Sequence, residues 1–530
     1  MPTERGPNMV DATVRPIVEA IVAKAPPGWT RAVLNSVAGA GGALVAGGYA
    51  VRGASRLSGH VPAPFTELMR LAEAVRELRG WRRTNLEIEC LPTGEYELVA
   101  FADTVTSLRG RAGGFQVVLD HGYRLPQPGF TQEEGTAAPA GDPDLAVARF
   151  RAYLERRAAI LGRPEPLPPP ASAAALEEAE RRLGRPLPAD LRALYELANP
   201  RGFHDDLCLF GNAVWLGLDS LVAVHEDVRE PMPPFWELGW NWVVFDTDPP
   251  GAVRRCGGHP AWLPFATSED GNFLAVDMSP APNGRPGQVI RVGRDHDDGP
   301  AYLADSVTSL LGHYLDLLER GAYEPEDEEE DGIYLPQPDY RLGPEEIIGE
   351  LPHDLPPGLQ AVHINDAPSP VDLTPLTAAP QVRQLNLNRC ATRDLTPVRA
   401  LPIESLRVTL AGGDLTPLAG HHHLAALDLG TATDHHAPVD LAPLRSLPNL
   451  RCLDLSRAEV ADLTVLADLP DLRYLALTTR QWNVLLEKGG APATLAAARL
   501  ADDTATLHDA LAWASRLGVD TGDSVRVTGG

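Results

Sequence analysis

Hydrophobic and polar positions in the first 128 residues follow helical and strand periods in turn. Apolar residues at 65, 68, 71, 72, 75 and 78 form a stripe with a 3.6-residue repeat, which predicts a helix over 65–78. Polar and apolar residues alternate over 85–90 and again over 96–101, which predicts two half-buried strands joined by a turn. Residues 1–128 are therefore expected to form an α+β domain.

The uncharged stretch 32–51 is long enough to cross a bilayer, so it needs a separate argument. It contains five glycines, and Gly39-Ala40-Gly41-Gly42 separates two runs that contain β-branched residues. This arrangement favours a strand, a tight turn and a second strand. We therefore predict a hairpin here and no membrane segment.

A second α+β domain is predicted over 161–322. It opens on a serine-capped helix at 172–183 and closes on a helix at 302–318. The preceding segment, 129–160, combines an aperiodic stretch with one helix and is interpreted as a linker and helix. Residues 323–349 contain the run EPEDEEEDG, whose carboxylates repel one another, so an acidic linker is expected there.

Leucines recur at a fixed period beyond residue 350. Units such as Leu424-x-x-Leu427-x-Leu429 place two leucines on one face of a short strand. A second motif, Asp-Leu-[Thr/Ala]-[Pro/Val]-[Leu/Val], recurs every 20 to 26 residues and begins at Asp372, Asp394, Asp414, Asp440 and Asp462. Such periods are typical of leucine-rich repeats, in which each unit buries its leucines only against its neighbours.

The repeats complete the predicted architecture. A short leucine-rich repeat solenoid is expected over 350–490, with a helical cap and tail over 491–530. The predicted fold class is α+β: two N-terminal α+β domains followed by a short leucine-rich repeat solenoid (α/β) with a helical cap.

The charge of the chain limits which partners are expected, and its cysteine content indicates the compartment. Forty-six basic and 72 acidic residues give a net charge of −26, and so acidic a surface repels phosphate backbones, which argues against nucleic acid. The five cysteines are far apart and form no CxxC motif, which is typical of a reducing compartment. The first residues lack the apolar core of a signal peptide, so a cytoplasmic protein is expected.

Clusters of metal-type side chains favour loops over ligand sites. Asp295-His-Asp-Asp-Gly299 lacks the glycine and glutamate positions of a calcium loop, so a polar turn is the favoured interpretation. His421–His423 and Asp434–His436 flank one repeat, with a spacing that fits no closed zinc site. The motifs G-x-S-x-G, HExxH and the P-loop do not occur in the sequence. We therefore expect no metal, no cofactor and no catalytic residue, and a protein that is not an enzyme.

Binding of another protein is the expected role. Aromatic residues cluster at 235–245; a buried sheet face is the default interpretation, and a partner-facing hot spot formed by Trp236 and Trp240 is the alternative. Residues between the leucines of each repeat strand point to the opposite face, where partner contacts are expected. The candidates on that face are Asn386, Arg407, Asp428, Asp454 and Tyr474. A solenoid that acts only as a spacer is the alternative.

The order of motifs over 161–320 resembles the SUKH superfamily. The matching stretches are LP..LR.LY...NP.G, WLPFA…DGN.LAVD, GQV and A.S...LL..YL. This superfamily includes the SMI/KNR-type domain of fungal cell-wall regulators and many bacterial immunity proteins. The first region, with Pro27-Gly28-Trp29 and the helix at 65–78, is similar to the YezG-like immunity family.

Two adjacent domains of these kinds imply an immunity protein that neutralises a toxin domain by direct binding. The expected partner is then a protein, namely the toxin domain. A signalling or cell-wall-regulatory scaffold that binds cellular proteins is the alternative. The sequence leaves the bound face and the oligomeric state open.

Overall fold

The structure is a computed structural model of the whole chain. It describes residues 5–39, 42–51, 60–62, 64–81, 84–102, 105–107, 114–200, 208–211, 213–228, 241–268, 270–296, 298–325, 333–336, 345–412, 414–432, 437–502, 505, 507–520 and 524–530. Contacts between residues divide the chain into two compact units, one of residues 1–123 and 346–530 and the other of residues 124–345. Within the described ranges, no helix has the length and hydropathy needed to span a membrane.

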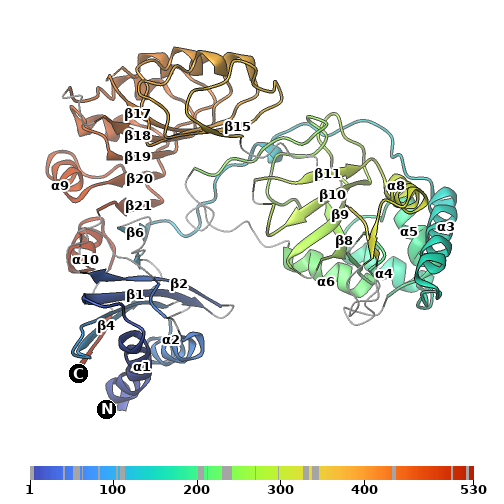
Figure 1. The fold of residues 1–530 in the computed structure, drawn as a ribbon, viewed down its shortest axis with the longest axis horizontal. Helices are drawn as coiled ribbons and strands as arrows, with labels where there is room; N and C mark the ends of the chain where they lie inside the picture. Colours follow the sequence, from blue (N-terminus) through green and yellow to red (C-terminus); the bar gives the residue numbers. More distant parts are fainter. Residues whose placement is uncertain are drawn as a thin grey trace. The chain divides into compact units, whose positions relative to one another are not determined.

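The unit of residues 124–345 is built on a five-stranded antiparallel sheet in the order β11-β10-β9-β8-β7. The strands are β7 (Val214–Trp215), β8 (Trp262–Thr267), β9 (Asn272–Asp277), β10 (Gln288–Gly293) and β11 (Ala301–Ala304). The helices are α3 (Pro143–Leu161), α4 (Ala173–Leu183), α5 (Ala189–Leu197), α6 (Leu218–Val228) and α8 (Val307–Arg320). Figure 1 shows α3, α5 and α8 together on one side of this sheet. A short antiparallel pair, β12 (Glu324–Pro325) and β13 (Ile333–Tyr334), follows α8.

An aromatic cluster fills the core between this sheet and its helices. The fully buried ring of Trp215 lies 5.6 Å from that of Phe150 on α3 and 5.3 Å from that of Tyr195 on α5. Two contacts join the chain just after α5 to the start of α6. The Asn199 side chain accepts a hydrogen bond from the backbone of Leu218, and a Cβ on Gly217 would lie 1.9 Å from the carbonyl oxygen of Pro200. The backbone at Gly217 therefore passes so close to Pro200 that a side chain at position 217 would not fit.

The structure corrects two expectations in this unit. The closing helix starts at Val307 rather than at 302, because residues 301–304 pair with β10 as a strand and Ser306 caps the helix. The aperiodic residues 127–142, here called the strap, are not a free linker, since their backbone is hydrogen-bonded along the unit. Gly129 donates to the carbonyl of Arg255, and Gly135 donates to that of Pro280.

The second unit contains an antiparallel sheet in the order β2-β1-β3-β4-β22. Its strands are β1 (Trp29–Gly39), β2 (Gly42–Val51), β3 (Thr84–Cys90), β4 (Tyr96–Ala102) and β22 (Ser524–Gly529). The hairpin predicted for 32–51 is confirmed by the pairing of β1 with β2. Helices α1 (Arg5–Ala23) and α2 (Phe65–Arg79) bury their apolar stripes in one core with the sheet.

The repeats form a ladder of parallel strands in this same unit (Figure 1). The parallel strands are β15 (Ala361–Asn365), β16 (Gln384–Asn388), β17 (Ser405–Leu410), β18 (Ala426–Thr431), β19 (Cys452–Arg457), β20 (Tyr474–Leu477) and β21 (Ala497–Leu500). The leucines that alternate with polar residues, such as Leu427 and Leu453, are fully buried. This is the spacing and the core that the repeat pattern predicts.

A 3-10 turn follows each of five strands of the ladder. The turns are η3 (Thr374–Ala378), η4 (Thr396–Ala400), η5 (Thr416–Leu418), η6 (Ala442–Ser446) and η7 (Leu463–Asp468). The recurring aspartate opens each turn: Asp394 Oδ1, for example, accepts from the backbone nitrogen of Thr396 at 2.8 Å. Hydrogen bonds from the side chain and then the backbone of Thr396 hold the pKa of the Asp394 carboxyl below its usual value. The repeated aspartate is therefore a structural cap.

The last part of the ladder differs from the expected helical cap over 491–530. Residues 497–500 form strand β21, and among the described residues beyond it only those of α10 (Leu507–Arg516) are helical. The strand β6 (Phe115–Val118), from the N-terminal part of the chain, pairs antiparallel with β21. On its other side β6 pairs with β5 (Val105–Ser107), which forms the edge of the sheet. The alanine-rich run at 495–500 has helical propensity, but pairing with its neighbours overrides it. As domain boundaries, the ranges given from the sequence stay a prediction.

Candidate functional site

The side of the ladder opposite the leucines carries the polar side chains, and we call it the ladder face. Because side chains alternate along a strand, one residue per strand falls in register across this face. The row is His363, Asn386, Arg407, Asp428, Asp454, Ala476 and Arg499. The register thus brings together four of the candidates that the sequence named.

The structure exposes these candidates unequally. Arg407 is exposed and Asn386 is half-buried, whereas Asp428, Asp454 and Tyr474 are buried. Of the five candidates only Arg407 is exposed, and their role in partner contacts stays a prediction. The candidates Trp236 and Trp240 lie outside the described residues.

A carboxylate shared by two arginines forms the centre of the ladder face. Asp428 Oδ2 lies 3.1 Å from Arg407 Nε, and Asp428 Oδ1 accepts from Arg457 Nη2 at 2.6 Å. Arg457 also donates from Nη1 to the Thr409 hydroxyl at 3.1 Å. We call Arg407, Asp428 and Arg457 the central triad. The triad thus places one carboxyl group between two guanidiniums, and its formal charge is +1.

Asp454 lies beside Asp428 on the next strand and behaves differently. Burial, together with the neighbouring Asp428 charge, raises the pKa of its carboxyl. The hydroxyl and backbone nitrogen of Ser456 donate to Asp454 Oδ1 at 2.6 and 2.9 Å, which partly offsets this effect. Asp454 is therefore a buried carboxyl group whose Oδ1 is already engaged by Ser456.

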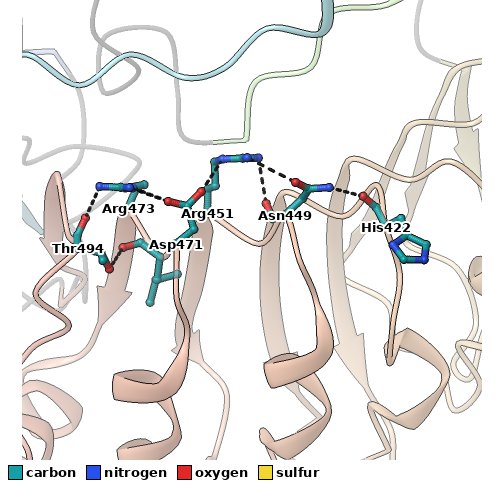
Figure 2. Close-up of polar contacts among 7 residues, drawn as sticks. His422, Asn449, Arg451, Asp471, Arg473 and Thr494 are labelled. Carbon is teal, nitrogen blue, oxygen red and sulfur yellow. Dashed lines mark hydrogen bonds and ion pairs between the residues drawn. The ribbon is translucent and has the colours of Figure 1, made fainter. Parts of the chain in front are cut away.

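A second arrangement of the same kind lies at the start of the strands. Figure 2 shows Asp471 between Arg451 and Arg473, with Asp471 3.1 Å from Arg451 Nε and 2.7 Å from Arg473 Nη2. Arg451 also donates to Asn449, and Arg473 donates to the carbonyl of Thr494. We call Arg451, Asp471 and Arg473 the rim triad. Sequence reasoning missed it, although arginine stands directly before the strand in three repeats, at residues 383, 451 and 473.

Tyr123 covers the rim triad from outside the repeats. Its ring centroid lies 5.1 Å from the guanidinium carbon of Arg473, a cation–π contact. Burial raises the pKa of the Tyr123 hydroxyl to about 12. The chain that leaves β6 thus packs on the start of the last strands, and this part of the ladder face is less open than the central triad.

The histidine and aspartate clusters serve the backbone. His421 Nε2 donates to the carbonyl of Leu401 at 3.0 Å, and Nδ1 accepts from the backbone nitrogen of Leu424 at 3.1 Å, which fixes the neutral tautomer. Asp295 bonds the Asn272 side chain at 2.8 Å and so closes a turn. His435 and His436 lie outside the described residues. Across the described part of the chain, no three metal-type side chains converge on a point.

The cysteines remain in the thiol form. Burial raises the pKa of Cys90 to about 11 and the pKa values of Cys256 and Cys452 to about 12. No disulfide links any of the five cysteines, all of which the structure describes. A thiol that is protonated at neutral pH is a poor nucleophile.

Motif residues in the unit of residues 124–345 hold its strands and helices together. Buried Asp277, at the end of β9, accepts from the Gln288 side chain at 2.9 Å and from the backbone of Ser279 at 2.9 Å. Buried Asp190 accepts from both the backbone and the hydroxyl of Thr308, each at 3.0 Å, at the start of α8. These carboxylates connect the stretches LAVD, GQV and the first turn of the last helix. They build the scaffold.

The comparison with protein families agrees with this arrangement. Residues 170–313 match the SMI1/KNR4 family (SUKH-1). The chain carries an SMI1/KNR4 domain. Helix α3 and the strap precede the matched residues, yet Phe150 and Tyr153 of α3 lie in the core of this domain.

Fungal regulators are among the curated relatives. The "Cell wall assembly regulator SMI1" of Saccharomyces cerevisiae is 37% identical over 83 residues, which cover 16% of this chain and 16% of that protein. The "Glucan synthesis regulatory protein" of Neurospora crassa is 48% identical over 52 residues, which cover 10% of each. "KNR4/SMI1 homolog 2" of Debaryomyces hansenii is 33% identical over 108 residues, 19% of this chain and 18% of that protein. The chain thus spans less than a fifth of these relatives.

Solved structures of two internalins from Listeria monocytogenes also have some similarity to the chain. Internalin InlF is 25% identical, with a TM-score of 0.20, and the likeness covers 23% of this chain and 35% of that one. Internalin C2 is 28% identical, with a TM-score of 0.18, and the likeness covers 23% of this chain and 54% of that one.

Proposed function

We propose that the chain is a non-enzymatic, cytoplasmic regulatory scaffold that binds cellular proteins, in the manner of a cell-wall or signalling regulator. The observation that carries this proposal is the SMI1/KNR4 domain together with the names of its curated relatives, which are regulators of cell-wall assembly and glucan synthesis. These names favour the scaffold over toxin neutralisation, the first expectation from the sequence. The similarity of residues 1–128 to the YezG-like family stays a prediction.

The arrangement of the site supports a binding role. The buried carboxylates of the SMI1/KNR4 domain are engaged in holding its fold. The ladder face, in contrast, presents the half-exposed guanidiniums of Arg407 and Arg457 on a rigid row of strands. Charged groups held on a rigid frame suit recognition of a protein surface. In our proposal the SMI1/KNR4 domain and the repeats each contribute binding surface.

Affinity capture tests the proposal. The tagged full chain is expressed in unstressed cells of its source organism, and captured proteins are quantified against a tag-only control. Enrichment of enzymes or regulators of cell-wall synthesis is the expected result. Capture of a secreted toxin domain alone, with protection of cells against that toxin, would favour toxin neutralisation over the scaffold function. Absence of any stoichiometric protein partner would contradict both.

A further inference from the structure

The part of the ladder face between β17 and β21 carries more arginines than carboxylates, in contrast to the net charge of −26 of the whole chain. Three arginines and two aspartates lie on its strands from β17 to β21: Arg407, Asp428, Asp454, Arg457 and Arg499. The rim triad adds two arginines and one aspartate. Each triad holds one carboxylate for two guanidiniums, so its own charges do not cancel.

The central triad keeps donor capacity for a further acceptor. Arg407 reaches Asp428 through Nε, and its two terminal nitrogens have no partner among the residues that the structure describes. Its side chain is 45% exposed and that of Arg457 is 37% exposed, whereas the Asp428 between them is 8% exposed. The inner carboxylate is covered, and the outer guanidinium edges face solvent. Guanidinium edges of this kind form paired hydrogen bonds with an incoming carboxylate.

We propose that the ladder face binds an acidic peptide segment of a partner protein, whose carboxylates pair with Arg407 and Arg457. This inference rests on the proposed scaffold function and specifies its partner. A Glu- or Asp-rich segment in extended form places every second side chain on one side, about 7 Å apart, which lets successive carboxylates reach both arginines. The neighbouring Asp454 is buried and its Oδ1 already accepts from the Ser456 hydroxyl, so the exposed charges nearest to such a segment are those of Arg407 and Arg457.

The chemistry favours a peptide over a nucleic acid. A long polyanion extends over the surrounding surface, and the acidic body of the chain repels it. A short segment meets only the local field, since charges more than about 10 Å away are screened at 0.1 M salt. Arg407 on β17 and Arg457 at the end of β19 are held by neighbouring strands on either side of Asp428 on β18.

A binding measurement with a defined peptide tests this inference. Fluorescently labelled octaglutamate is titrated with the full chain, and octaglutamine serves as the uncharged control. We expect octaglutamate to bind at low ionic strength and to weaken steadily as salt is added. The double variant Arg407→Gln/Arg457→Gln is expected to weaken binding about tenfold, as for the loss of two partly exposed charge pairs.

The matched control removes an arginine of another exposed pair. Arg445 pairs with Asp468 at 2.7 Å on the turn side of the repeats, and Arg445→Gln should leave octaglutamate binding unchanged. If the double variant does not fold, as judged by circular dichroism, Arg407→Gln alone serves, since among the described residues Arg407 forms a single ion pair. No binding of octaglutamate, an equal loss in Arg445→Gln, or tighter binding of a single-stranded oligonucleotide would each overturn the inference.

The affinity capture described above separates the two proposals. Cellular partners that are retained equally by the wild type and the arginine double variant, with no octaglutamate binding, would refute the acidic-segment inference and leave the scaffold function intact. Octaglutamate binding without any cellular partner would refute the scaffold function instead.

Discussion

Arg254 Nη1 donates a hydrogen bond of 2.6 Å to the carbonyl oxygen of Gln132, which ties the SMI1/KNR4 domain to the strap that precedes it. The same guanidinium donates to the carbonyls of Gly129 and Ser279 at 2.9 and 2.6 Å. Arg254 is buried, so these carbonyls depend on it for their partners. The strap is therefore part of the folded unit, although it lies outside the residues that match the family.

Replacing this arginine should destabilise the unit strongly. Arg254→Leu removes the donor of three carbonyls in buried or partly buried bonds, and we expect a loss of about 2–5 kcal/mol in the free energy of unfolding. Hydrogen exchange of the strap amides, measured in the full chain, reports this loss of stability. Arg285→Leu is the control, because Arg285 makes an exposed bond of 3.2 Å to Ala138 of the same strap. Similar losses in both variants would show that burial of Arg254 is not the cause.

The buried leucines of the ladder should dominate the stability of the repeats. Leu427 is fully buried between neighbouring repeats, and Leu427→Ala is expected to cost about 2–5 kcal/mol through the cavity that it leaves. Ile348→Ala removes an apolar side chain that is 83% exposed and should have little effect. Thermal unfolding followed by circular dichroism compares the two. An unchanged transition in Leu427→Ala would contradict the repeat core.

The C-terminal strand should stabilise the N-terminal sheet. Strand β22 pairs with β4 over Ser524–Gly529 and buries Val525 and Val527. Deleting residues 524–530 removes about 3 kcal/mol of apolar burial and exposes the edge of β4. Hydrogen exchange of residues 96–102 should then accelerate. Arg526→Gln, which removes only a long exposed ion pair with Glu97, is the control and should leave this exchange unchanged.

The stability of the SMI1/KNR4 domain should fall as pH rises from about 4 to 7. Burial raises the pKa of the Asp277 carboxyl to about 7, whereas the unfolded chain titrates near its ordinary value of about 3.9. Between these values the folded state binds more protons than the unfolded state, so unfolding becomes easier with each step upward in pH. The expected change is on the order of a few kcal/mol.

Asp277→Asn isolates this contribution. The variant cannot lose a proton, so its stability at pH 5 and pH 7.5 should differ less than that of the wild type. Denaturant unfolding at the two pH values, followed by hydrogen exchange of β9 and β10, gives the comparison. An identical pH dependence in both proteins would mean that Asp277 does not titrate in this range.

Local patterns were sufficient for most elements. The stripe at 65–78 became α2, the alternating stretches became β3 and β4, and the leucine period set the ladder. The order of weak motifs pointed to the SMI1/KNR4 domain. Each of these signals depends on neighbours in sequence, which is why a single chain reveals it.

Pairing between strands that are far apart in the sequence could not be predicted from such local patterns. Nothing in residues 115–118 specifies β21 as the partner of β6, and the strap has no periodicity because its order comes from Arg254 and other distant donors. The site shows the same limit. The sequence placed Arg407 and Asp428 on one face, but it did not reveal that Arg457, from the end of the following strand, completes the triad.

The interleaved path of the chain sets an order on its biosynthesis. The unit of residues 124–345 is continuous in sequence, so all of its strands have left the ribosome once residue 345 has emerged. The strands of the N-terminal sheet are synthesised first, but the edge strand β22 is missing until residues 524–529 emerge. Strand β6 likewise has no partner on one side until β21 has been synthesised. A nascent chain therefore carries two unpaired strand edges for most of its translation, and these edges are where chaperones would act.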